Sequence, residues 1–247
     1  MKKHTAVLLV LIVFILPKAN SQAVITGSLK NVKDTINWVY AYYAVDGKRI
    51  ADSIEVKNDK YAFNLNITEP TQVTLRARKF EVKTGVAALS NRTTKKDIAT
   101  LFIEKGKITV VSVDSFSNTT VKGSKTNDEF VKLTALAKPY NDQMQELNKQ
   151  FSALLKEQKK EEAKKVEDQL DAVDAKLNEE VYAAYARNNP QSPLALYALQ
   201  RYAGYENQEK AEPIFNLLPK NAQESFAGIT LKNKIEISKK QVSVNMQ

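Results

Sequence analysis

Alternating apolar and polar positions fill the first half of the chain and predict β-strands. In KYAFNLNI, residues 60–67, the apolar side chains fall on every second position, so they share one face of a strand. TQVTLRAR, residues 71–78, alternates in the same way. WVYAYYAV, residues 38–45, is rich in aromatic and β-branched residues, a composition that also favours a strand.

Polar turns separate these strands. Asp46-Gly47 and Asn58-Asp59 are turn signals, and Lys105-Gly106 places a bend in TLFIEKGKITVVSV, residues 100–113, which we interpret as a hairpin. Short strands without intervening helices favour an antiparallel β-sandwich of about six to eight strands over a parallel sheet. The stretch from Phe80 to Lys96 is predicted to be a long loop that shields one end of the sandwich.

Beyond Gly123 the apolar period becomes that of a helix. Thr126 and Glu129 in TNDE predict a capping box at the helix start. Apolar residues then recur at spacings of three and four, and a bend is expected at Pro139. This first stripe consists of Phe130, Leu133, Ala137, Tyr140, Met144, Leu147, Phe151 and Leu154.

A second helical stripe, from Ala163 to Val181, is out of phase with the first, and residues 156–162 between them are all polar. Two antiparallel helices that meet at this charged tip would reconcile the stripes. One helix of about 60 residues would instead leave much apolar surface uncovered. We therefore predict a helical hairpin within one chain, with a coiled-coil dimer as the alternative. The predicted fold class is α+β, an N-terminal antiparallel β-sandwich followed by an all-α region that contains this long hairpin.

The stretch NNPQSPLALYALQRYAGYE, residues 188–206, predicts the end of one helix and the start of another. Pro190 disfavours helical conformation in the residue before it. Ser192 is a good N-cap, and Pro193 suits the first helical position because its missing N–H costs nothing there. Gly204 is expected to end this helix.

The same stretch supplies the candidate interaction surface. Its tyrosines either line a pocket or pack against the protein with the hydroxyl in contact with water. We favour packing, because aromatic side chains contribute much of the buried area in such helices. The candidate residues are Ser192, Tyr197, Arg201, Tyr202 and Tyr205.

The chain begins with the pattern of an export signal. Lys2 and Lys3 precede an apolar run that is shorter than the roughly 20 residues needed to span a bilayer, and small residues follow it. We expect cleavage, a periplasmic or secreted product, and no stable membrane insertion afterwards. The predicted division is a signal peptide at 1–22, a sandwich at 23–125, a helical domain at 126–240 and a polar tail at 241–247.

The amino-acid composition argues against most common types of catalytic and metal-binding site. The chain has no cysteine, and its single histidine, His4, lies in the predicted signal peptide. Thiol chemistry, histidine acid–base catalysis and ordinary zinc, copper or haem sites are therefore not expected. Phosphate-binding glycine motifs are missing, and adjacent carboxylates such as Glu179-Glu180 point to different sides of a helix. We predict no enzyme activity, no cofactor, and no catalytic or metal-binding residue.

The net charge of +9 is spread along the chain rather than gathered. Lys and Glu are interleaved in KEQKKEEAKK, as on a solvated helix surface. A nucleic-acid-binding face would concentrate basic residues with interleaved aromatics, so nucleic acid is not an expected partner.

The order of these parts resembles the N-terminal accessory region of Gram-negative envelope thiol-disulfide oxidoreductases of the thioredoxin-like type. The resemblance rests on the sandwich passage DGKRIADSIEVKNDKYAFNL, on LFIEKGKITV followed by VKGSKTNDEF, and on NNPQSPLALYAL with IFNLLP and LKNKIEISKK. In that family a thioredoxin-like domain with a Cys-x-x-Cys pair follows such a region. This sequence carries no such pair, so the resemblance implies a stand-alone accessory domain of unknown function without redox activity.

Two functions are consistent with these observations. The preferred hypothesis is a non-catalytic exported binding module that docks an envelope protein, such as a thioredoxin-like oxidoreductase; a homodimer stays open. The alternative is a small-ligand or glycan-binding periplasmic protein that uses the sandwich loops or the tyrosines of residues 197–205.

Overall fold

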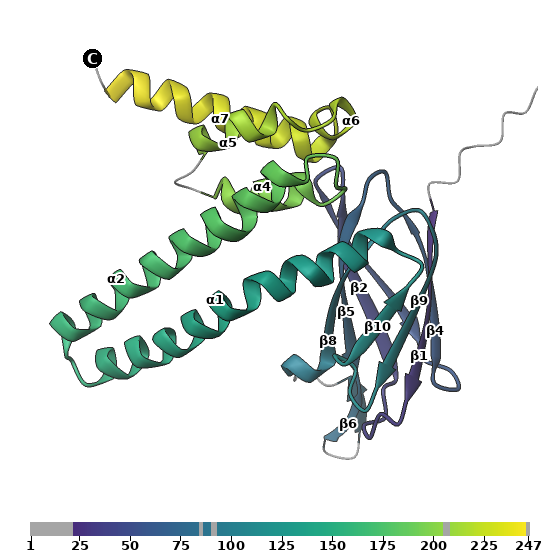
Figure 1. The fold of residues 1–247 in the computed structure, drawn as a ribbon. Helices are drawn as coiled ribbons and strands as arrows, with labels where there is room; N and C mark the ends of the chain where they lie inside the picture. The colour runs from purple at the N-terminus through teal and green to yellow at the C-terminus, as the bar shows by residue number, and fades with distance from the viewer. Residues whose placement is uncertain (1–21, 84–85, 90–92, 205–207, 246–247) are drawn as a thin grey trace, which may run out of the picture.

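The computed structural model describes residues 22–83, 86–89, 93–204 and 208–245, and shows a β-sandwich followed by helices (Figure 1). The predicted α+β fold class is confirmed. The predicted signal peptide lies almost entirely outside the described residues.

Eight of the described strands form two four-stranded sheets. Sheet A has the order β10-β9-β1-β4, and sheet B has the order β3-β2-β5-β8. The strands of sheet A are β1 (Gln22–Lys30), β4 (Lys60–Asn66), β9 (Gly106–Val113) and β10 (Thr119–Lys122). Those of sheet B are β2 (Trp38–Val45), β3 (Lys48–Glu55), β5 (Thr71–Arg78) and β8 (Ile98–Ile103).

The period-two faces predicted from the sequence form the sandwich core. Tyr61, Phe63 and Leu65 of β4 are buried against Val73 and Leu75 of β5 in one cluster. Both predicted turns have positive φ at their two central residues, 48° and 75° at Asp46-Gly47 and 49° and 57° at Asn58-Asp59. That is the conformation of the two-residue hairpin turn that Asn and Gly tolerate best.

The pairing of the strands differs from the prediction in two respects. β1 pairs antiparallel with β4 but parallel with β9, whereas every other described pair is antiparallel. β8 and β9 do not form the predicted hairpin, because β8 pairs with β5 in sheet B and β9 with β1 in sheet A. The bend at Lys105 carries the chain from one sheet to the other. Alternation fixes which side chains face the core but not which strands pair.

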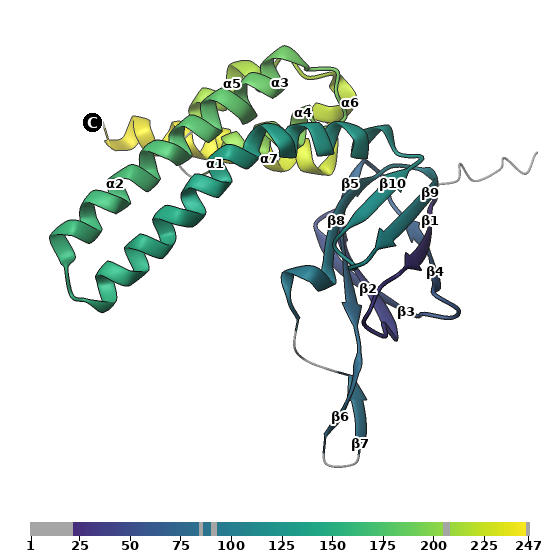
Figure 2. The same cartoon turned by 60° about the horizontal axis from the view of Figure 1, so that its bottom comes forward.

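A small hairpin replaces part of the predicted loop between residues 80 and 96. β6 (Phe80–Lys83) pairs with β7 (Val86–Leu89), and the short 3₁₀ helix η1 (Lys95–Asp97) follows. Figure 2 shows this hairpin extending beyond the end of the sandwich. Strands of four residues are too short for alternation to identify them.

The predicted helical hairpin is confirmed. α1 (Lys125–Lys156) and α2 (Lys160–Lys176) lie side by side and meet at a short tip that contains Gln158 (Figures 1 and 2). Gln158 has a φ of 61°, so the turn is made without glycine or proline. Leu147 of the first stripe and Val166 and Val173 of the second are buried together along the hairpin.

α2 continues into a π-helical segment, η2 (Leu177–Ala183), and then α3 (Ala184–Asn188). Three consecutive side chains of η2, Val181, Tyr182 and Ala183, are buried. The wider π turn rotates the buried face of the helix, so the simple three-four spacing of the second stripe ends there.

The capping box predicted at Thr126 and Glu129 is wrong. The N-cap of α1 is Ser124, whose Oγ accepts the backbone N–H of Asn127 at 3.1 Å. The backbone N–H of Lys125 donates instead to the carboxylate of Glu104 at 2.7 Å. A side chain from the sandwich thus completes the helix start, and local sequence cannot show that contribution.

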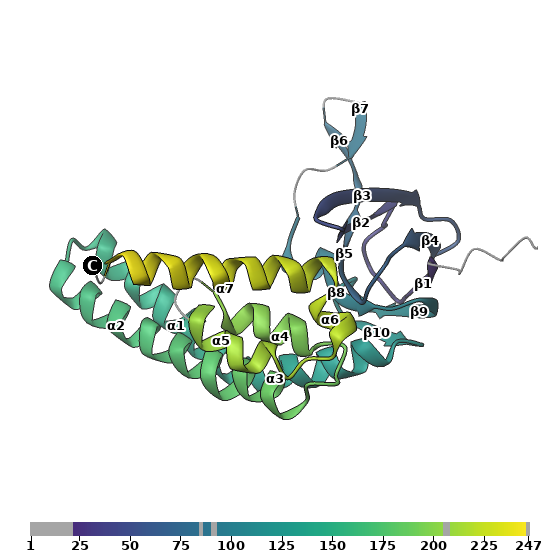
Figure 3. The same ribbon diagram turned by 90° about the horizontal axis from the view of Figure 1, so that it is seen from above.

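The remaining helices pack beside the base of the hairpin (Figure 3). They are α4 (Ala195–Tyr202), α5 (Gln208–Phe215), α6 (Lys220–Gln223) and α7 (Phe226–Asn245). α4 begins after Leu194, two residues later than predicted from Ser192. α7 runs on to Asn245, so the boundary predicted at residue 240 falls inside a helix.

Candidate functional site

An aromatic cluster joins the sandwich to the helical region. Phe102 lies near the end of β8, with its side chain on the face that points away from the sandwich core. Phe130 belongs to the first turns of α1, and Tyr197 belongs to α4. The ring centroid of Phe102 lies 5.1 Å from that of Phe130 and 5.0 Å from that of Tyr197. Phe102 is buried, and its contact with Tyr197 is edge-to-face, a favoured arrangement of aromatic rings.

Hydrogen bonds fix the same joint. The backbone N–H of Phe102 donates to Oδ1 of Asn127 at 3.1 Å, and the hydroxyl of Ser124 donates to the Phe102 carbonyl at 3.1 Å. The hydroxyl of Thr126 donates to Glu104 at 2.7 Å. These contacts satisfy buried polar groups on both sides, so the start of α1 is held in one orientation on sheet B.

A cleft of about 880 Å³ opens at this joint, and we call it the junction cleft. Its sandwich wall comes from the β2–β3 turn, the β4–β5 connection and β8. Its helical wall comes from the segment before α4, from α4 itself, from α6 and from the start of α7. The lining residues are Ala44, Asp46, Thr68, Glu69, Pro70, Thr71, Gln72, Phe102, Gln191, Ser192, Pro193, Leu196, Tyr197, Gln200, Pro219, Asn221, Ala222, Glu224, Ser225, Phe226 and Ala227.

The lining of the junction cleft is acidic and polar. Among the described residues that line it, the charged ones are Asp46, Glu69 and Glu224, and none of these described residues is positive although the chain as a whole is basic. Side-chain amides and hydroxyls supply the other polar groups. Phe226, 47% exposed, stands at the rim with its ring against Gly47. Such a surface offers hydrogen-bond acceptors and donors together with the exposed apolar ring of Phe226, and it favours ligands with hydroxyl or ammonium groups.

A three-membered polar cluster lies behind the helical wall. The hydroxyl of Tyr185 donates to Oε2 of Glu129 at 2.8 Å and lies 2.9 Å from Oγ of Ser192. Ser192 also donates to the same carboxylate oxygen and accepts the backbone N–H of Leu194 at 3.1 Å. Burial, together with the negative charge of Glu129, raises the pKa of Tyr185 to about 12.

This cluster explains why a serine stands at position 192, between α3 and α4. The serine fixes the chain that leaves α3 to the first turns of α1 and, at the same time, accepts a backbone N–H before α4 begins. Because its pKa is raised, Tyr185 keeps its proton, and the cluster is held together by two hydroxyls that donate to the Glu129 carboxylate. Its role is to position the helical wall of the cleft.

The five candidate residues separate in the structure. Ser192 and Tyr197 line the junction cleft. Arg201 is exposed, with its guanidinium 5.4 Å from the ring centroid of Tyr182. Tyr202 is only 3% exposed, so the packing interpretation is right for this residue. Tyr205 lies outside the described residues.

Sequence reasoning missed most of the cleft. Gln72 and Phe226 lie far apart in the chain, and neither belongs to a motif, so only the packing of the helical region on sheet B brings them together. On the sandwich wall of the cleft, the Asp46-Gly47 turn was the one feature that a local sequence pattern predicted.

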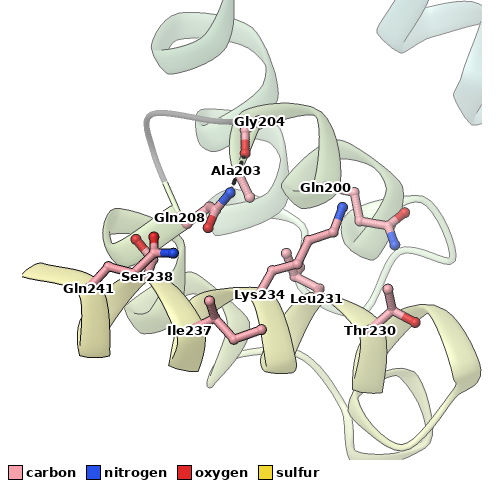
Figure 4. A pocket seen from close by; sticks show the side chains of 10 residues that line it. All are labelled: Gln200, Ala203, Gly204, Gln208, Thr230, Leu231, Lys234, Ile237, Ser238 and Gln241. Atoms are coloured by element: carbon pink, nitrogen blue, oxygen red, sulfur yellow. Dashed lines mark hydrogen bonds between the residues drawn. The ribbon is translucent and has the colours of Figure 1, made fainter.

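A second hollow lies between α7 and the α4–α5 pair, and we call it the α7 groove. Its volume is about 670 Å³. Figure 4 shows Lys234 reaching from α7 toward α4, with Leu231 on the floor and Ile237 at the edge. Gln208 donates to the Gly204 carbonyl at 3.0 Å across one end. Of the described residues that line it, Lys234 is the single charged one.

The described residues contain no group of three or more His, Cys, Asp or Glu side chains placed to hold a metal ion. Within the same residues, no helix combines the length and the apolar character that crossing a bilayer requires.

Comparison with known proteins adds a family for the sandwich. No curated protein and no solved structure matches the chain. The model of one family, described as a domain of unknown function, matches the sandwich and the first turns of α1. The match to this family, DUF4369, covers residues 23–130 of the chain.

Proposed function

We propose that the protein is a non-catalytic, exported binding module that acts as an accessory to envelope thiol-disulfide exchange proteins. The observation that carries the proposal is the junction cleft, which is built from both regions and is open to solvent. The composition supports a binding role, because the chain has no cysteine and its one histidine is His4. The resemblance to the accessory region of thioredoxin-like oxidoreductases supports the envelope setting.

The walls of the junction cleft suit a protein segment. An inserted segment would contact the β4–β5 connection on one side and α4 on the other, with Phe226 as an apolar contact at the rim. Exposed apolar side chains continue along α7 at Ile229 and Ile237, 50% and 55% exposed. Aromatic and aliphatic groups at the centre of a contact, with polar groups around them, are the usual composition of a protein interface.

A crosslinking experiment tests this function. The protein, tagged at its C-terminus, is crosslinked in living cells, and the co-purifying envelope proteins are identified by mass spectrometry. Thr68→Arg places a long cation in the cleft wall, whereas Asn64→Arg places the same side chain on the exposed outer face of β4. We expect a thioredoxin-like partner that Asn64→Arg retains and Thr68→Arg loses. Recovery of the protein alone, or a partner insensitive to Thr68→Arg, would refute the proposal.

The second candidate is a small-ligand or glycan-binding protein, and the acidic, amide-rich lining of the cleft favours it. A volume of about 880 Å³ lies within the range of small-molecule sites. Thermal unfolding is measured with a panel of envelope sugars and amino sugars. Stabilisation that Glu224→Gln abolishes, but Glu236→Gln on the exposed side of α7 does not, is the expected result; equal loss in both variants would contradict a cleft site.

A further inference from the structure

The outer face of sheet B carries an unusual row of side chains. Trp38, Tyr40 and Tyr42 occupy alternate positions of β2, and Arg76 and Arg78 occupy alternate positions of the adjacent β5. We call these five residues the aromatic platform. The intervening residues of β2, such as Val39 and Ala41, are buried in the sandwich core. The platform side chains therefore point away from the core and are partly exposed.

The strand register pairs the rings with the guanidinium groups. Trp38 is opposite Arg78, and Tyr40 is opposite Arg76. The rings of Tyr40 and Tyr42 are nearly parallel, at 13°, with centroids 6.2 Å apart. The guanidinium of Arg78 lies 5.7 Å from the ring centroid of Tyr40. Contacts among neighbours thus hold the rings in a row, which reduces the entropy lost when a ligand binds.

A ligand can contact the side chains of the platform but cannot hydrogen-bond to its backbone as an added strand would. β2 and β5 are the two central strands of sheet B, so each pairs with a neighbour on both sides. A peptide could not add to this face by strand pairing and would leave its own backbone groups unmatched. A sugar polymer has no such requirement, because it presents apolar C–H faces to aromatic rings and hydroxyls to polar side chains. Ser53 and Thr74, which flank Tyr40 and Tyr42 in the register, supply hydroxyls.

We propose that the aromatic platform binds an acidic polysaccharide, with the rings against the sugar faces and Arg76 and Arg78 against the carboxylates. Guanidinium groups match carboxylates in geometry as well as in charge. From Trp38 to Tyr42 the strand spans roughly 14 Å at about 3.4 Å per residue. The site therefore fits several units of a linear chain rather than a single sugar. It uses none of the residues that line the junction cleft, so it stands or falls independently of the function proposed above.

The chain provides its own reporter, since Trp38 is the single tryptophan. The mature protein is titrated with polygalacturonate, with dextran as a neutral sugar polymer and poly-L-glutamate as a polyanion without sugar rings. We expect a saturable change in Trp38 emission with polygalacturonate that exceeds the change with either of the others. Unchanged emission with polygalacturonate overturns the proposal. An equal response to poly-L-glutamate overturns the assignment to a glycan, and an equal response to dextran overturns the role of the arginines.

Variants examined by affinity electrophoresis in gels containing polygalacturonate locate the site. Tyr42→Ala and Arg76→Gln should each weaken the retardation constant about tenfold, the effect of losing one ring contact or one charged pair. Lys107→Gln, which removes one charge from the exposed outer face of sheet A, is the matched control and should leave retardation unchanged. An equal loss in the control would mean that net charge alone drives binding, and would overturn the platform as the site.

Discussion

The aromatic cluster at the joint between the sandwich and the helical region makes a quantitative prediction. Phe102 is 4% exposed, and its ring lies 5.0 Å from that of Tyr197 in an edge-to-face contact. Such contacts contribute about 0.5–1.5 kcal/mol beyond the area that they bury. In a double-mutant cycle of Phe102→Leu and Tyr197→Leu, we expect a coupling free energy of about 1 kcal/mol, because leucine keeps most of the volume but removes the ring interaction.

Urea unfolding followed by circular dichroism measures the free energies of unfolding for the four proteins of the cycle. Leu147→Ala is the control partner, because Leu147 is buried in the separate cluster along the hairpin. Its effect should add to that of Phe102→Leu within about 0.5 kcal/mol. Strict additivity of Phe102→Leu and Tyr197→Leu would refute the conclusion that this contact stabilises the joint.

Three further outcomes follow from single residues. Gly47→Ala should lower the free energy of unfolding by about 1–2 kcal/mol in thermal unfolding, because Gly47 has a φ of 75° and an added Cβ would lie 2.5 Å from the Phe226 ring. Ser124→Ala should cost about 1–2 kcal/mol in urea unfolding, since it removes the N-cap of α1. Burial and Glu129 raise the pKa of Tyr185 from 10.0 to about 12. The stabilisation of the folded state by the protonated tyrosine is therefore complete below pH 10 and is lost as the pH rises toward 12. Over that interval the free energy of unfolding of Tyr185→Phe, measured in urea titrations, should fall less than that of the parent protein.

Each of these outcomes has its own control or contrary result. Gly204→Ala should cost less than Gly47→Ala, because Gly204 does not have a positive φ and the nearest atom to an added Cβ, the Arg201 carbonyl oxygen, lies 3.8 Å away. Ser124→Thr keeps a capping hydroxyl and should recover part of the loss. A pH profile of Tyr185→Phe that parallels the parent protein between pH 10 and 12 would show that Tyr185 does not contribute to the alkaline loss of stability.

The contacts at the joint also agree with the extent of the DUF4369 match, which ends at residue 130 rather than at the last strand. Ser124, Asn127 and Phe130 all belong to the start of α1, and all contact β8. The first turns of α1 are therefore packed as part of the sandwich, although their secondary structure belongs to the helical region.

The sequence by itself determined the elements that depend on near neighbours in the chain. Alternation identified the buried faces of β4 and β5, the Asp46-Gly47 dipeptide identified a hairpin turn, and the polar run at residues 156–162 located the tip of the helical hairpin. Each of these depends on the periodic direction of side chains or on the backbone preference of one or two residues, so a short window contains the whole signal.

Tertiary structure alone decided the strand partners and the candidate sites. The parallel pairing of β1 with β9, the capping of α1 by Glu104 and the walls of the junction cleft all join residues that are distant in the chain. The sequence singled out Ser192 and Tyr197 but not Gln72 or Phe226 beside them. No local pattern specifies such contacts, because they are selected by how well whole faces pack and satisfy one another's polar groups.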